Sequence, residues 1–99
     1  MKFFSTRNSS SSTTFKNVLL NGLAPDGGLY MPEIIPRMPM DLLKAHQHFE
    51  ELAVSVIHPY TKDQLSRSEL KTICEKAFNF PINIKYLNEG DLVLELFHG

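Results

Sequence analysis

The sequence predicts a small fold of the mixed α/β class, and within it an α+β domain, with three helices, short strands and a C-terminal hairpin. Two kinds of periodicity support this fold class. Apolar residues recur every three to four positions in three segments, which begin near residues 15, 41 and 66, as on one face of a helix. From Pro81 onward they alternate instead, which is the period of a strand. With 99 residues, 42% of them hydrophobic, the chain can build one small core.

The N-terminal part predicts a strand, a loop and a helix. Lys2 to Thr6 carry aromatic and β-branched side chains without a helix breaker, which is typical of a short strand. The serine run from Ser9 to Thr14 predicts a flexible loop. A helix should follow, with Thr14 as its N-cap and Gly22 near its end. Its apolar face consists of Phe15, Val18, Leu19 and Leu23.

The stretch from Gly22 to Pro32 holds three of the five glycines and two of the six prolines. Pro25 fixes φ for a turn, and the Asp26 side chain can accept a hydrogen bond from its own backbone. Gly27 and Gly28 allow a positive φ or a close approach of the backbone. We therefore expect a chain reversal that passes close to a packed element or a ligand, and the packed element is favoured.

Two further helices follow an extended connector. Leu29 to Met31 should be extended, and the prolines at 32, 36 and 39 exclude a helix there. An amphipathic helix then begins at Asp41 and is expected to end at Pro59. Its predicted core stripe consists of Leu42, Ala45, Phe49, Leu52, Ala53 and Val56.

The third helix has the clearest start signal in the chain. Ser66 and Glu69 have the spacing of a capping box, and Leu65 and Leu70 that of a hydrophobic staple. Its apolar face consists of Leu70, Ile73, Cys74, Ala77 and Phe78.

The segment after Pro81 predicts a hairpin. Ile82, Ile84 and Tyr86 alternate with polar residues, and the turn residues 88–91 follow. Residues 92–97 form an apolar strand that should be buried on both faces apart from Glu95. Such a strand needs more protein to cover it than the hairpin itself, so we expect an isolated chain to self-associate through this strand.

Composition excludes several classes of function. Ten basic and eleven acidic residues, without a basic block, argue against nucleic acid and an anionic membrane as partners. No stretch is apolar enough for a signal peptide or a membrane span. The phosphate-binding motifs of Walker and dinucleotide type are absent, and the histidines lack metal-ligand spacing. The single cysteine, Cys74, excludes an internal disulfide and indicates a buried thiol in a cytoplasmic protein.

Three motifs and the start of the first helix together resemble the N-terminal region of the threonine synthase family. The motifs are Ser5-Thr6-Arg7, the turn from Gly22 to Pro32, and the terminal segment from Leu94 to Gly99, and the helix opens at Phe15. They stand in the family's order and spacing, and the resemblance covers essentially the whole chain. It implies part of a fold-type II pyridoxal-phosphate lyase that converts O-phosphohomoserine and water to threonine and phosphate. A threonine synthase-like phospholyase and a non-catalytic accessory module are the alternatives.

The resemblance also implies a division of the chain and a truncation. Residues 1–80 would be the N-terminal domain, and residues 81–99 a hairpin that leads into the catalytic domain. In the family, Phe-His-Gly is soon followed by Ala-Phe-Lys-Asp, whose lysine anchors the cofactor. Because the sequence stops at Gly99, we expect the fragment to be inactive and to bind no pyridoxal phosphate.

No catalytic, cofactor-binding or metal-binding residue can be assigned from the sequence. Phe97, His98 and Gly99 are expected to lie nearest the active site, since they lead into the lysine segment. His98 either lines the substrate pocket or caps the strand end. Arg7 could reach a phosphate, but a surface charge is the favoured interpretation.

Overall fold

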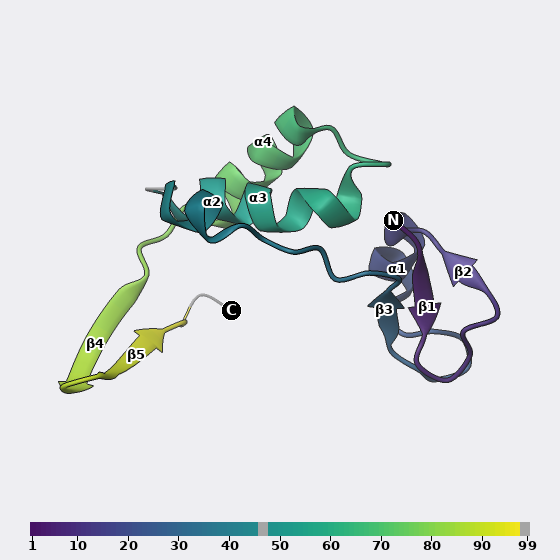
Figure 1. The fold of residues 1–99 in the computed structure, drawn as a ribbon, viewed down its shortest axis with the longest axis horizontal. Coiled ribbons are helices and arrows are strands. Elements are labelled where there is room, and N and C mark those ends of the chain that lie inside the picture. Colours follow the sequence, from purple (N-terminus) through teal and green to yellow (C-terminus); the bar gives the residue numbers. More distant parts are fainter. Residues whose placement is uncertain (46–47, 98–99) are drawn as a thin grey trace.

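The computed structural model describes residues 1–45 and 48–97, and three units follow one another along the chain (Figure 1). A small sheet with one helix comes first, a group of helices second and a hairpin last. The elements are β1 Phe3–Ser5, β2 Ser12–Thr13, α1 Phe15–Asn21, β3 Tyr30–Pro32, α2 Met40–Ala45, α3 Phe49–Thr61, α4 Arg67–Ala77, β4 Asn83–Asn88 and β5 Asp91–Glu95. The mixed helix and strand class expected from the sequence is confirmed.

The N-terminal sheet has β1 at its centre, in the order β2-β1-β3, with both pairings antiparallel. Phe3 lies opposite Thr13 on one side and Pro32 on the other, and its ring centroid is 6.0 Å from that of Phe15. The expected loop over residues 9–14 is therefore wrong at Ser12 and Thr13. These residues are extended because they pair with β1, a long-range contact that overrides the low strand propensity of serine.

The predicted ends of the first helix are confirmed. The Thr14 side chain caps α1 by accepting a hydrogen bond from the Asn17 amide at 3.4 Å. Gly22 ends the helix with φ of +70°, a conformation that favours glycine.

The second predicted helix is wrong in two respects. It is divided into α2 and α3, because His48 is extended with φ −120° and ψ 141° and forms the N-cap of α3. It also continues through Pro59 to Thr61. A proline in the last turn removes a single backbone hydrogen bond, and the following amide of Lys62 still donates to the His58 carbonyl at 2.9 Å.

The helical core is formed between α3 and α4. It consists of Ala53, Val54, Leu70 and Cys74, with Ile57, Leu65 and Phe78 packed against it. Of the predicted stripe of the second helix, only Ala53 belongs to this cluster, whereas Phe49 and Val56 remain 42% and 40% exposed. The buried face of α3 is therefore rotated toward Val54 and Thr61, because α4 approaches from that side.

The signals of the third predicted helix are confirmed. The Ser66 side chain accepts from the Glu69 amide at 3.3 Å, and the Glu69 carboxylate accepts from the Ser66 amide at 2.8 Å. The Ser66 hydroxyl also donates to the Glu69 carboxylate at 2.6 Å, and this bond, followed by the one from the Ser66 amide, lowers the pKa of the Glu69 carboxyl. Leu65 packs on the cluster that contains Leu70, as a staple requires. Cys74 is buried, and burial raises the pKa of its thiol.

The C-terminal hairpin forms as predicted, but its expected burial is not found within the chain. Figure 1 shows β4 and β5 standing away from the helices. Every residue of β4 is exposed, and so is every residue of β5 except Glu95. Glu95 is the more sheltered residue because its carboxylate pairs with Lys85 Nζ at 2.6 Å. The apolar residues lie open because this chain supplies no layer to cover them.

The chain as a whole is extended. Its radius of gyration is 16.4 Å, whereas a compact domain of this length would have about 13 Å. Figure 1 shows the hairpin standing apart from the helices, an arrangement that raises this radius.

Replacing Ser66 with alanine should lower the free energy of unfolding by about 1 kcal/mol, because the cap of α4 is lost. Lys76→Ala is the control on the same helix, since Lys76 is an exposed residue of the last turn, away from the cap, and its loss should cost under about 0.5 kcal/mol. Urea denaturation of both variants measures the difference. Equal losses would mean that the capping box does not stabilise the helix.

Candidate functional site

Two of the sequence motifs meet at one place, where the end of β1 contacts the turn between α1 and β3. The Asp26 carboxylate accepts hydrogen bonds from the Ser5 hydroxyl at 2.7 Å and from the Gly28 amide at 2.8 Å. Arg7 Nη1 donates to the Asp26 carbonyl at 2.9 Å. Ser5-Thr6-Arg7 and the glycine turn thus form one structure, which we call the strand–turn clasp and define as residues 5–7 and 24–29.

Backbone bonds hold the two halves of the clasp in register. The Thr6 amide donates to the Leu29 carbonyl at 2.8 Å, and the Leu29 amide donates to Thr6 Oγ1 at 3.0 Å. Within the turn, the Ala24 amide donates to the Gly28 carbonyl at 3.0 Å, and the Gly27 amide donates to the Ala24 carbonyl at 2.8 Å. The turn therefore continues the pairing of β1 with β3 beyond the last sheet residue.

The two glycines of the turn serve different needs. Gly27 has φ of +76°, in the left-handed region that side chains disfavour. The φ of Gly28 is not positive, but a Cβ there would clash with Ser5 Oγ and lie 3.1 Å from the Arg7 amide nitrogen. The close approach expected from the sequence is therefore made to a packed element, the end of β1.

The hydrogen bonds of the clasp also set its charge. They lower the pKa of the Asp26 carboxyl, chiefly through the Ser5 hydroxyl and next through the Gly28 amide. The nearby Arg7 guanidinium adds a smaller coulombic effect in the same direction. Asp26 is thus held as an anion that accepts hydrogen bonds, which suits a structural anchor better than a proton donor.

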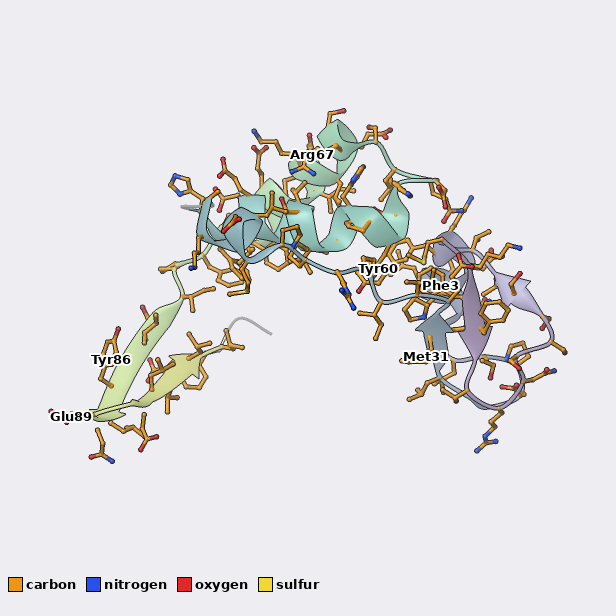
Figure 2. All side chains as sticks on the ribbon, viewed as in Figure 1. Phe3, Met31, Tyr60, Arg67, Tyr86 and Glu89 are labelled. Atoms are coloured by element: carbon orange, nitrogen blue, oxygen red, sulfur yellow. The ribbon has the colours of Figure 1, made fainter. Side chains whose placement is uncertain are left out.

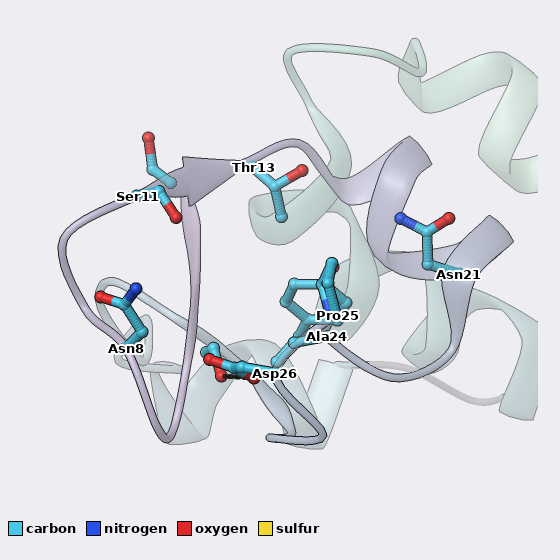
Figure 3. A pocket seen from close by; sticks show the side chains of 10 residues that line it. Asn8, Ser11, Thr13, Asn21, Ala24, Pro25 and Asp26 are labelled. Atoms are coloured by element: carbon cyan, nitrogen blue, oxygen red, sulfur yellow. Dashed lines mark hydrogen bonds between the residues drawn. The ribbon is translucent and has the colours of Figure 1, made fainter.

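A hollow of about 330 Å³ lies beside the clasp (Figure 3). Figure 3 shows Asn8, Asn21 and Asp26 around it. Its lining is rich in hydroxyls and amides and comprises Ser5, Asn8, Ser11, Ser12, Thr13, Asn21, Ala24, Pro25, Asp26 and Tyr30. None of these lining residues carries a positive charge or an imidazole. As far as its described lining goes, the hollow therefore lacks a counterion for phosphate. Its carboxylate, Asp26, contacts the Ser5 hydroxyl, but the lowered pKa of Asp26 makes it a weak base for activating that serine.

The residues that the sequence placed nearest an active site are only partly described. Phe97 is 83% exposed and lies beyond the end of β5, whereas His98 and Gly99 lie outside the described residues. Arg7 is exposed, as expected of a surface charge, and it also holds the turn through Asp26.

Among residues 1–45 and 48–97, no group of three His, Cys, Asp or Glu side chains could hold a metal ion. Within the same ranges, no helix is long and apolar enough to span a bilayer.

Sequence reasoning did not find the clasp as a unit. It singled out both motifs but gave no reason for Ser5 and Asp26 to meet. A signal was present in the glycine pair behind Pro25-Asp26, which exceeds what a simple turn needs.

Comparison with known proteins gives consistent matches. The sequence profile described as threonine synthase N terminus matches residues 2–78. Threonine synthase of Pseudomonas aeruginosa is 35% identical, and the alignment covers 100% of this chain and 23% of that protein. Threonine synthase-like 2 of Xenopus laevis is 32% identical, with coverages of 100% and 23%. The chain thus spans about a quarter of the length of these relatives.

A solved structure agrees with these matches. The crystal structure of threonine synthase from Brucella melitensis with bound PLP superposes on this chain with a TM-score of 0.87. The sequence identity is 31%, and the match covers 100% of this chain and 23% of that one.

Replacing Gly28 with alanine should lower the free energy of unfolding by about 1–3 kcal/mol, because the new Cβ meets the Ser5 hydroxyl. When Ser5 is already alanine, Gly28→Ala should lower the free energy of unfolding by only roughly half as much. Ser5 Oγ, the atom nearest to the new Cβ, is then gone, whereas Asp26 Oδ1 still lies 3.0 Å from that Cβ. Denaturation of the two single variants and the double variant measures this coupling.

Gly90→Ala provides the control for that cycle. A Cβ at Gly90 meets nothing within 4 Å, so its cost should add to that of Ser5→Ala. If the losses in unfolding free energy of Ser5→Ala and Gly28→Ala were also additive, the close packing of the clasp would be contradicted.

Proposed function

Since this chain belongs to the threonine synthase N-terminal family, we propose that it forms the N-terminal part of a pyridoxal-phosphate-dependent lyase. The proposed reaction converts O-phosphohomoserine and water to threonine and phosphate. The observation that carries this proposal is the similarity along the whole chain to a threonine synthase with bound PLP, with a TM-score of 0.87. The reaction itself is carried over from such relatives.

The proposal assigns residues 1–80 to the N-terminal domain and residues 81–99 to a hairpin that leads into the catalytic domain. Two observations support this division. The family profile ends at residue 78, shortly before β4 begins at Asn83. The hairpin also exposes its apolar residues, which a following domain would cover.

The described residues of this chain do not fit the cofactor. When bound, pyridoxal phosphate supplies an electron sink for carbanions, and it is anchored by a lysine whose amine is activated by desolvation or by neighbouring charge. All seven lysines here are exposed, and the lining of the hollow beside the clasp has no cation to hold a phosphate. We therefore propose that the cofactor is held entirely by the part of the enzyme that follows, and that residues 1–99 have no lyase activity of their own.

The role left for residues 1–99 is to support that catalytic part. Phe97, His98 and Gly99 remain the proposed nearest approach to its active site, on the basis of the family motif. The proposed location is the cytoplasm, which the buried, unpaired thiol of Cys74 supports.

One other reaction is favoured by a specific observation. Because threonine synthase-like 2 of Xenopus laevis also matches the whole chain, a phospholyase reaction is the second candidate.

The test is to express the reading frame that contains this chain, extended as far as it continues, and to assay the purified protein with pyridoxal phosphate and O-phosphohomoserine. We expect equimolar threonine and phosphate, and a borohydride-reduced cofactor adduct on a lysine beyond residue 99. Phosphate without an equimolar amount of threonine would favour the phospholyase. A specific adduct on a lysine within residues 1–99, or a frame that stops at Gly99, would contradict the proposal.

A further inference from the structure

An apolar groove runs along the junction between the N-terminal sheet and α3. Its volume is about 510 Å³, and its lining consists of Phe3, Phe15, Pro32, Ile35, Val56, Ile57 and Tyr60. Figure 2 shows Phe3 and Tyr60 at this junction. None of these lining residues is charged. The groove is separate from the hollow beside the clasp, with which it shares no lining residue.

The groove has an aromatic floor and an open aliphatic rim. Phe3 is buried at 6% exposure and contacts the ring of Phe15. On the rim, Ile35 is 70% exposed and Val56 is 40% exposed. Large open apolar surfaces of this kind mark sites where other protein binds. Next to Phe15, the Lys16 amide of α1 donates to Gln64 Oε1 at 2.8 Å, which joins α1 to the turn that follows α3.

The rest of the fold indicates what covers the groove. The segment that carries Ile35 runs along the same side of α3 as the side from which the hairpin extends (Figure 1). In this view β5 runs from the hairpin tip back toward that same side of α3. About three quarters of the length of these relatives lies outside the matched part, and the matching family profile is described as an N terminus.

We propose that this groove seats apolar side chains from the catalytic part of the same polypeptide, so that the enzyme is held at the groove as well as at the hairpin. The inference rests on the proposed function, since it requires the longer chain. A segment tethered through β5 has a high effective concentration at the groove, which favours it over a second copy of the protein. The catalytic part would then be attached to residues 1–99 at two places, the hairpin and the groove.

Thiol labelling of the full-length protein tests the proposal. Ile35→Cys places the probe on the rim, and Lys71→Cys is the matched control on α4, where the native side chain is 58% exposed. Both changes are at exposed positions, and circular dichroism checks that the variants fold. Maleimide modification is followed by peptide mass spectrometry, with the unsubstituted protein as the blank for Cys74.

We expect the introduced thiol of the Ile35→Cys variant to react roughly tenfold more slowly than that of the control, with equal rates in urea. Equal rates in the native protein would overturn the proposal. Slow labelling that disappears on dilution, together with a dimer in sedimentation, would also overturn it, because a second copy would then be the occupant. If the enzyme is active but the thiol at position 35 reacts as fast as the control, this inference alone is contradicted. If that thiol is protected but the protein has no lyase activity, only the proposed reaction is contradicted.

Discussion

The absence of a side chain at Gly28 is the constraint on which the N-terminal half of the structure depends. Only without a Cβ can this backbone lie against Ser5 while the Asp26 carboxylate bonds to both residues. That contact places Leu29 opposite Thr6 and thereby sets the register in which β3 joins β1. The register in turn points Phe3 toward Phe15, where it forms the floor of the apolar groove. The close contact between Gly28 and Ser5 thus helps to set the position of the apolar groove.

Local signals were sufficient for the features that depend on neighbours in sequence. The capping box at Ser66, the cap at Thr14 and the glycine end at Gly22 were predictable, because each bond joins residues within a few positions. The hairpin was predictable for the same reason. The family resemblance added the order and spacing of the turn and Ser5-Thr6-Arg7 along the chain, which periodicity does not provide, but not their contact.

The features that failed depend on contacts between distant segments. Ser12 and Thr13 form a strand because β1 lies beside them, and nothing in a serine run indicates that partner. The core face of α3 turns toward Val54 because α4 packs there, a choice that helical periodicity leaves open. The expected burial of the hairpin is not met by the described residues of this chain, and the apolar pattern of a strand does not say what covers it. For the site, the sequence marked Asp26 and Gly28 as a turn but did not show that Ser5 completes it.

Amide hydrogen exchange on the full-length protein tests most directly whether the clasp is the organising contact. The amides of Thr6, Gly28 and Leu29 each donate to an acceptor within the clasp. They should therefore exchange at least roughly tenfold more slowly than in an unstructured peptide, and all three should accelerate together in Ser5→Ala. Exchange of Gly28 and Leu29 at unprotected rates, or acceleration of Gly28 alone in that variant, would show that the turn and the strand are not one cooperative unit.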